Sequence, residues 1–334
     1  MGRRRFTDID LAKGLAITLV VFGHVVAREA PAGNDWYVAA KHLVYQFHMP
    51  FFMFLSGAVF EATHAPPGGP AAYRHWVARK AARLLPGFAL FSLLIWAGKA
   101  VASRFLHVDN APTGGVEELL RIFATPASSV AGSLWYVYVL FEFFLVFPLV
   151  YRAAGGRLAP IVAFAACLHA ASLAFPLPDL FAIDRFCEYA LFFALGFVFV
   201  RHHDALAPLL RRRAPLFGAL FALSFASLLP WPDARSKTLV GLCAIPALIG
   251  AVGAIRGERA RSALLLLGEY TFSIYLMNTL CIGLAKGLLL EVLPWDGARF
   301  LLFFPVLFAA GLVGPLLLHR HVLVRVPALA RITK

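Results

Sequence analysis

Charged residues are scarce in this chain: Asp, Glu, Lys and Arg make up only 15% of its 334 residues. Soluble globular domains carry about 25% charged residues, so the chain lacks the charge to cover a water-soluble surface of its size. Hydrophobic residues make up 60% of the sequence, and its mean hydropathy is +0.76. This balance argues against a soluble globular protein and favours a membrane protein.

Cysteine is scarce as well. Each of the four cysteines falls inside an apolar run, and none belongs to a Cys-x-x-Cys pair. Metal and redox sites commonly use such pairs, whereas single buried cysteines behave as small hydrophobic residues. We therefore expect no bound metal and no disulfide. The four are Cys167, Cys187, Cys243 and Cys281.

Long apolar runs, in contrast, fill nearly the whole chain. Each is roughly 17–25 residues long, which is the length a helix needs to cross about 30 Å of hydrocarbon. Backbone groups in lipid must be hydrogen-bonded within the segment, so the runs predict helices. The sequence therefore predicts an all-α polytopic membrane protein with about ten transmembrane helices, forming a single domain over residues 1–334. The expected spans are 10–27, 43–62, 84–103, 131–151, 158–176, 185–200, 214–230, 238–255, 263–285 and 299–318.

Basic residues give these helices an orientation. The formal net charge is +13, but the distribution of the charge matters more than its sum. Of the 31 Lys and Arg residues, twenty fall on the side that holds both termini and ten on the other, with Lys13 inside the first span. Cytoplasmic loops carry such an excess, so we expect both termini to be cytoplasmic. Topology explains the positive charge, and no nucleic-acid partner is expected.

The first span contains a lysine and a histidine on one face. Lys13 and His24 are eleven residues apart, which places them about 20° from eclipsed and about 16 Å apart along the axis. Ionisable groups in spanning helices are costly and by default mark a functional interior. His24 is a candidate general base; the alternative is a hydrogen bond that joins two helices. Lys13 alone fits snorkelling to the interface, and Asp10 is spaced to pair with it.

The span 131–151 holds a carboxylate among apolar residues. Trp135, Tyr138 and Glu142 lie on one helical stripe, which should face the protein interior. Glu142 should then be paired with a cation or protonated, and a structural ion pair and a catalytic role are both open. Arg185 and Glu188, three residues apart near a helix end, are expected to form a surface pair.

Three further segments carry polar groups with more than one interpretation. Ser56 and Gly57 permit close helix packing or backbone exposure to a ligand. Lys80 and Arg83 share a face at a spacing that suits a phosphate, although topology alone also places basic residues there. Ser273, Tyr275 and Asn278 add hydroxyl and amide groups to the span 263–285; in isolation such groups are ordinary hydrogen-bonding residues between helices.

Five motifs occur in a fixed order along the chain. The first is a basic residue, ten residues and a histidine, from Lys13 to His24. The second is His48-Met-Pro-Phe-Phe-Met-Phe-Leu-Ser56-Gly57. The others are the basic block at 80–86, Leu134-Trp135-Tyr136, and a glycine-to-leucine string at 268–276 that contains Ser273-Ile-Tyr275. Together they resemble the acyltransferase-3 family of membrane O-acyltransferases, over essentially the whole chain. Within that family, the chain resembles the branch that is similar to fucose 4-O-acetylases and nodulation-factor acetyltransferases.

The sequence departs from the pattern of that family at two positions. Lys13 stands where many members have arginine, and Asn278 stands where many have histidine. The chain also lacks the soluble hydrolase-like domain that some members carry, so the membrane part is expected to handle the acceptor.

The resemblance implies transfer of an acyl group, usually acetyl from acetyl-CoA, to a hydroxyl of a cell-envelope or exported glycan. It also implies a multi-pass protein of a bacterial inner membrane, with an acyl-CoA as co-substrate and no permanently bound cofactor. The competing hypothesis is a transporter or flippase of lipid-linked glycans, which would act without acyl-CoA. The expected catalytic residues are His24, Lys13 and Glu142. The expected acyl-CoA ligands are Arg79, Lys80 and Arg83. The expected substrate or oxyanion residues are Asp10, His48, Ser56, Trp135, Tyr275 and Asn278.

Overall fold

The computed structural model describes residues 6–26, 31–63, 67–104, 112, 114–231, 233–326 and 329–330. These residues form helices and connecting turns, and none of them is in a β-strand. The basic residues Arg3, Arg4, Arg5 and Arg28, which contribute to the predicted orientation, lie outside the described residues. The α-helices are α1 (Thr7–His24), α2 (Asp35–Tyr45), α3 (His48–Thr63), α4 (Pro70–Ala102), α5 (Val116–Ala124), α6 (Trp135–Ala153), α7 (Leu158–Ala174), α8 (Ile183–Arg201), α9 (His203–Arg212), α10 (Ala214–Ser224), α11 (Ala234–Ala254), α12 (Glu258–Glu269), α13 (Thr271–Leu290) and α14 (Phe300–His321).

Six helical stretches of the described chain are long and apolar enough to cross a membrane, and two further apolar helices are shorter. The all-α, multi-pass prediction is therefore confirmed. The count of ten crossings and the cytoplasmic location of both termini stay predictions. Among the helices outside this set, α1 and α8 each carry three or more charged residues. The six stretches are Asp35–Thr63, Pro70–Ala102, Gly132–Ala153, Ala234–Ala254, Thr271–Leu290 and Phe300–Arg325.

Two of the predicted spans contain a break in the helix that the sequence did not reveal, although 43–62 still lies within the apolar stretch Asp35–Thr63. The span 43–62 includes the turn at Gln46 and Phe47 between α2 and α3. Pro50 explains this turn, because its ring would clash with the carbonyl group of Gln46 in a continuous helix. The span 263–285 is interrupted at Tyr270 between α12 and α13. There the Thr271 hydroxyl donates to two carbonyl oxygens at the end of α12, and such bonds favour a bend.

Helix α4 is longer than the span predicted for it. The span 84–103 is only the second part of α4, which begins at Pro70 and continues through Pro86. The first half of α4 is too polar to appear as an apolar run. A short helix, α5, lies between α4 and α6 in the chain.

Helices α3 and α8 pack with their backbones in close contact. A β-carbon placed on Gly57 would lie 1.8 Å from the carbonyl oxygen of Phe193, and one on Gly196 would lie 2.3 Å from that of Phe54. The close packing expected at Ser56-Gly57 is therefore confirmed. Aromatic rings extend this contact, with Phe60 stacked on Phe197 at 5.3 Å.

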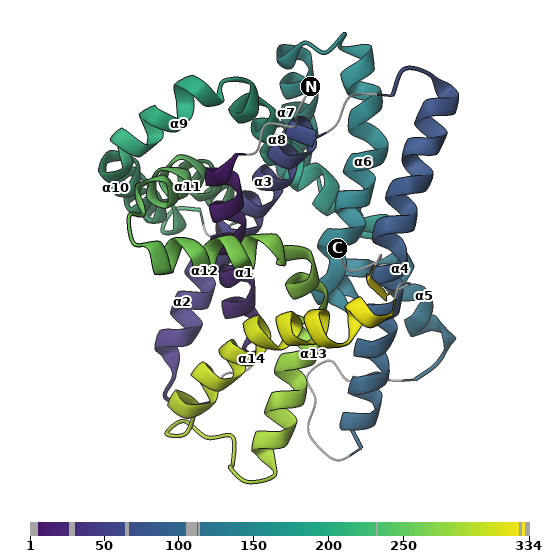
Figure 1. Cartoon of the computed structure of the whole chain (residues 1–334), viewed down its shortest axis with the longest axis vertical. Coiled ribbons are helices and arrows are strands. Elements are labelled where there is room, and N and C mark those ends of the chain that lie inside the picture. Colours follow the sequence, from purple (N-terminus) through teal and green to yellow (C-terminus); the bar gives the residue numbers. More distant parts are fainter. Residues whose placement is uncertain are drawn as a thin grey trace.

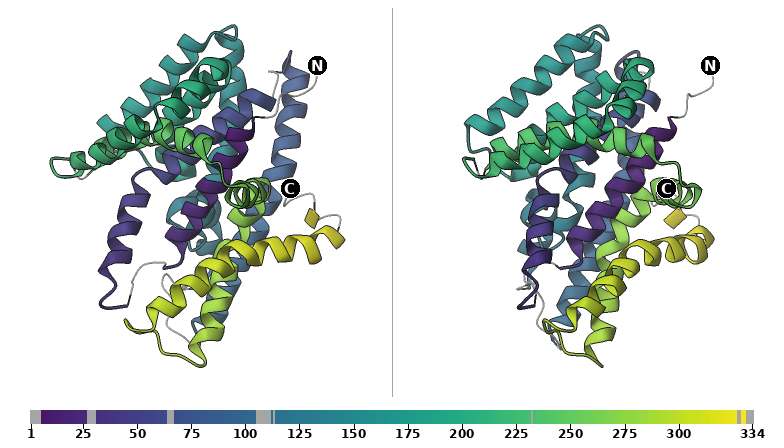
Figure 2. Two further views of the ribbon diagram at one scale, coloured as in Figure 1. Left: turned by 60° about the vertical axis from the view of Figure 1, so that its left-hand side comes forward. Right: turned by 90° about the vertical axis from the view of Figure 1, so that its left-hand side faces the viewer.

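Helix α1 lies within the bundle and contacts α3, α11, α12 and α13. Helix α12 crosses it, and α13 turns away from the end of α12 (Figure 1). Two glycines permit this crossing: a β-carbon on Gly14 would lie 2.0 Å from the carbonyl oxygen of Leu264, and one on Gly268 would lie 2.1 Å from that of Asp10. Helix α14 packs obliquely on α13 (Figure 1 and Figure 2).

One arginine joins three elements at the end of the bundle where α8 finishes. The Arg201 guanidinium donates to Glu61 of α3 (2.7 Å), to the Tyr151 hydroxyl of α6 (2.6 Å) and to the carbonyl oxygen of Gly156 (2.5 Å). A planar guanidinium presents its donors in fixed directions, so this contact fixes the ends of α3, α6 and α8 relative to one another.

The α3–α8 contact predicts a strong difference between two glycine substitutions. Gly57→Ala should lower the free energy of unfolding by about 1–3 kcal/mol, because the added methyl group forces two packed backbones apart. Gly283→Ala is the matched control, since a β-carbon there meets nothing within 4 Å. Thermal unfolding of the two purified variants in detergent measures the difference. Equal melting temperatures would contradict the α3–α8 packing.

Candidate active site

The end of α1 is held by one face of α2. Three α2 side chains donate to carbonyl oxygens there: Tyr37 to Phe22 (2.8 Å), Tyr45 to Gly23 (3.0 Å) and Lys41 to Val26 (2.6 Å). The last carbonyl groups of a helix have no partner within it. Donors at positions 37, 41 and 45 are four residues apart and therefore lie on one stripe of α2. This stripe fixes the position of His24, the last residue of α1, and the sequence analysis did not identify it.

His24 forms a hydrogen bond with Asn278 of α13. The imidazole Nδ1 lies 2.7 Å from the Asn278 side-chain oxygen. The Asn278 side-chain nitrogen donates to the carbonyl oxygens of Ile274 (2.9 Å) and Tyr275 (2.8 Å), which assigns the amide orientation. Its oxygen must therefore accept, and Nδ1 of His24 carries the proton. Nε2 is then left with its lone pair, ready to accept a proton.

A second imidazole lies beside the first. His48, at the start of α3, donates from Nδ1 to the carbonyl oxygen of Val44 (3.0 Å) and stacks on the Tyr45 ring at 4.8 Å. It is 8% exposed and close enough to His24 to interact with it electrostatically. The structure therefore brings His24, His48 and Asn278 together, three of the predicted site residues from three different helices.

Lys13 lies toward the other end of α1. Its ammonium pairs with Asp10 at 3.2 Å, so the predicted ion pair is confirmed. Both side chains are half-buried. The pair borders the α12 crossing, because the backbone of Asp10 contacts Gly268. The Lys13–His24 face thus joins this crossing to the imidazole cluster.

The three predicted acyl-CoA ligands differ in their surroundings. Arg79 and Arg83 are exposed on α4. Lys80 is buried, with its ammonium 4.7 Å from the centre of the Trp76 ring and 4.4 Å from that of Phe144. Aromatic faces attract a cation in this way. Lys80 therefore points into the bundle, whereas the two arginines point away from it.

The candidate oxyanion donors have other acceptors in this conformation. Ser56 donates to the carbonyl oxygen of Phe52 (2.8 Å) and so accepts a hydrogen bond from Tyr136 (2.7 Å). Tyr275 donates to the carbonyl oxygen of Ser133 (2.6 Å). Trp135 instead stacks on the Tyr189 ring of α8 at 5.4 Å.

Glu142 lies apart from His24. Its neighbours include Asp184 and Cys187 at the start of α8, and it forms no ion pair with any described residue. Its Oε2 is buried and has no hydrogen-bond partner in the described part of the chain. Of the two alternatives for Glu142, the structural ion pair is therefore not present among the described residues.

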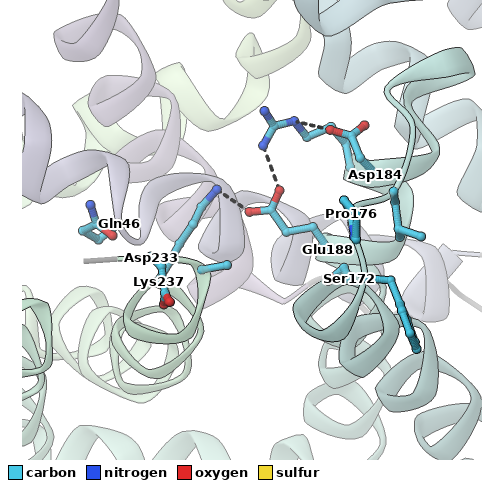
Figure 3. Close-up of a pocket in the computed structure, with 11 residues that line it drawn as sticks. Gln46, Ser172, Pro176, Asp184, Glu188, Asp233 and Lys237 are labelled. Carbon is cyan, nitrogen blue, oxygen red and sulfur yellow. Dashed lines mark hydrogen bonds and ion pairs between the residues drawn. The ribbon is translucent and has the colours of Figure 1, made fainter. Parts of the chain in front are cut away.

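The predicted pair of Arg185 and Glu188 is present, and it belongs to a larger, partly buried network. Glu188 accepts hydrogen bonds from Arg185 (2.8 Å) and from Lys237 of α11, and only 16% of its side chain is exposed. Lys237 also donates to the Tyr189 hydroxyl (2.7 Å). Arg185, Glu188 and Lys237 form one network between α8 and α11 (Figure 3). The sequence could not reveal the third partner, which lies 49 residues from Glu188.

Comparison with known proteins identifies the family. The acyltransferase-domain model of the acyltransferase-3 family matches residues 6–320. The chain belongs to the acyltransferase-3 family. The family recognised from the five motifs is therefore confirmed.

Two curated relatives of the chain are nodulation proteins. Nodulation protein NolL of Sinorhizobium fredii (strain NBRC 101917 / NGR234) is 26% identical over 234 residues, which cover 69% of this chain and 58% of that protein. Nodulation protein NolL of Mesorhizobium japonicum (strain LMG 29417 / CECT 9101 / MAFF 303099) is 26% identical over 144 residues, covering 42% and 35%. The matched region thus spans about a third to somewhat over half of these relatives. No solved structure matches the chain.

The His24–Asn278 hydrogen bond predicts a defect in turnover. Asn278→Leu should lower kcat of the acyltransferase by about 10²–10⁴-fold, because either ring nitrogen of His24 can then carry the proton. Since Asn278 acts through His24, KM for the acyl donor should stay within about twofold. Steady-state kinetics of membranes with matched protein abundance measures both constants.

Thr279→Val, at the next position of α13, is the control for that experiment. Its hydroxyl makes only a long 3.5 Å contact with Ser133, so its kcat should stay close to that of the wild type. A normal kcat in Asn278→Leu would contradict the orienting role.

Proposed function

We propose that this protein is an O-acyltransferase that moves an acetyl group from acetyl-CoA to a hydroxyl of a cell-envelope or exported glycan, in the inner membrane of a bacterium. The observation that supports this most directly is the His24–Asn278 hydrogen bond, which leaves Nε2 of His24 as a proton acceptor. A positioned base of this kind serves the transfer of an acyl group to a hydroxyl.

The reaction follows from that tautomer. Nε2 of His24 removes the proton of the acceptor hydroxyl as its oxygen attacks the thioester carbonyl carbon. The tetrahedral intermediate then expels the CoA thiolate, which takes the proton from the imidazolium. One ester bond forms, one thioester bond breaks, and the base is returned to its starting state. Positioned base catalysis typically contributes about 10²–10⁴-fold, so oxyanion donors must supply much of the rest.

The donor reaches His24 from the Lys13 end of α1 in this proposal. Arg79 and Arg83 are exposed and basic, which suits the phosphates of CoA. The pantetheine arm then follows the Lys13 face toward His24, about 16 Å along the helix. Single hydroxyl rotations would turn Ser56 or Tyr275 from their present acceptors toward an oxyanion.

The proposed reaction predicts a mass difference in the envelope. Cells that express the protein should carry a glycan about 42 Da heavier per acetyl group than cells without it, and His24→Ala should abolish that difference because the proton acceptor is gone. Mass spectrometry of isolated envelope glycans, with immunoblots for abundance and membrane insertion, measures the result.

The matched control for His24→Ala is His42→Ala on α2, because His42 is exposed. Asn34→Ala would not serve as a control, since Asn34 is buried. His42→Ala should acetylate normally. Unchanged acetylation by His24→Ala would end the proposed mechanism, and glycan transport without any dependence on acyl-CoA would favour the transporter hypothesis.

The proposed donor site predicts a defect in KM. The double variant Arg79→Glu, Arg83→Glu should raise KM for acetyl-CoA by about tenfold at low salt with little change in kcat, because two phosphate-binding charges are reversed. The difference should shrink as ionic strength rises. Arg211→Glu, Arg212→Glu on α9 is the matched control, and an equal rise in KM there would argue against a specific site on α4.

A further inference from the structure

A polar pocket lies between α7, α8 and α11 and the turn that joins α2 to α3. Its volume is about 440 Å³, and none of the expected acyl-CoA ligands lines it. The polar side chains around it come from four separate parts of the chain (Figure 3). They include Gln46, Ser172, Asp184, Arg185, Asp233 and Lys237.

One carboxylate oxygen in this pocket has unmet hydrogen-bonding capacity. Oδ1 of Asp184 is buried and has no hydrogen-bond partner among the described residues. Nε of Arg185 is buried as well and lies 3.4 Å from Oδ2 of the same carboxylate, as an ion pair without a hydrogen bond. Buried polar atoms are nearly always hydrogen-bonded. An open acceptor beside a loosely engaged donor fits a ligand group that both donates and accepts, and a hydroxyl is such a group.

The charge of the pocket disfavours the acyl donor. Three carboxylates line it, namely Asp184, Glu188 and Asp233. Each carboxylate already has a cation beside it. Arg185 and Lys237 bond to Glu188. Arg185 also lies 3.4 Å from Asp184, and Arg235 lies 4.0 Å from Asp233. The lining therefore offers a polyanion such as CoA no spare positive charge. A neutral molecule rich in hydroxyl groups needs no counter-charge and finds several acceptors.

The pocket adjoins the histidine cluster. Gln46 lies two residues before His48, and Lys237 acts electrostatically on His48. Phe47, which lies between Gln46 and His48 in the sequence, packs with Val240 and Ala244 of α11. The Tyr45 ring stacks on His48 at 4.8 Å, and its hydroxyl donates to the carbonyl oxygen of Gly23, the residue before His24. A molecule in the pocket therefore lies next to the histidine cluster.

The pocket and the proposed donor path reach His24 by different routes. Lys13 lies about 16 Å from His24 along α1, whereas the pocket adjoins His48 at the start of α3. Two substrates can therefore approach His24 separately.

We propose that this pocket binds the acceptor, a neutral hydroxyl-rich molecule, and delivers one of its hydroxyls past His48 to His24. The acyl donor enters from the Lys13 end of α1. This assignment rests on the proposed function, because an acceptor site has meaning only if the protein transfers an acyl group to a hydroxyl.

Filling the pocket tests the assignment. Ala234, the first residue of α11, lines the pocket and is exposed. Ala234→Trp should reduce acylation of envelope glycans at least tenfold, while binding of acetyl-CoA to the purified full-length protein stays within twofold of the wild type. Ala298→Trp, at an exposed position outside the pocket, is the matched control and should acylate normally.

The outcomes separate this assignment from the proposed function. Normal acylation by Ala234→Trp overturns the pocket assignment, and so does a parallel loss of acetyl-CoA binding at unchanged abundance, since the cavity would then serve the donor or the fold. The proposed function is tested separately, by comparing glycan acetylation by the wild type and by His24→Ala. Its failure is therefore visible without any pocket variant.

A second variant tests the class of ligand. The Asp233 side chain accepts a hydrogen bond from the backbone N–H of Arg235 at the start of α11 (2.8 Å), and asparagine caps a helix as well as aspartate does. Asp233→Asn therefore removes charge and keeps the cap. Acylation at limiting acceptor should fall about threefold or more as an acceptor oxygen is lost. A rise in acylation would indicate an anionic acceptor and would overturn the proposal that the acceptor is neutral.

Discussion

The site depends on satisfying the hydrogen bonds at the end of α1, where the helix finishes inside the bundle. The last carbonyl oxygens of a helix have no partners of their own, and in a membrane water is not available to replace them. Tyr37, Lys41 and Tyr45 of α2 meet this demand, and Asn278 of α13 bonds to the imidazole. Each bond that satisfies a buried polar group also restricts the position of His24.

Glycine contacts set where the other elements approach. Gly14 and Gly268 let α12 cross α1 beside the Lys13–Asp10 pair, and Gly57 and Gly196 let α8 pack against α3. Helix α8 therefore presents Asp184, Arg185 and Glu188 at the end of the bundle where α3 begins, close to His48. The close contacts thus place a polar network beside the histidines without any long loop.

What the sequence could predict was local. Apolar runs located the helices, and spacing of three residues predicted the Asp10–Lys13 pair. Helix breaks at Gln46 and Tyr270 were missed, because a hydropathy run does not show where a proline clashes or a hydroxyl caps. Asn278 and Lys237 were out of reach as partners: the contacts they make span 254 and 49 residues, and only tertiary packing brings those side chains together.

The partner that orients His24 is an uncharged amide, and this limits how the site can operate. A carboxylate there would balance a protonated ring, whereas Asn278 offers only a dipole and the ammonium of Lys41 acts on the same imidazole. A cation without a counter-ion is costly in a low-dielectric interior. In the reaction we propose, the protonated ring is therefore short-lived, and proton removal is productive only when the departing CoA thiolate is ready to receive the proton. The proposed reaction thus requires a ternary complex, with both substrates bound before chemistry begins, and not a stepwise exchange through a stored intermediate.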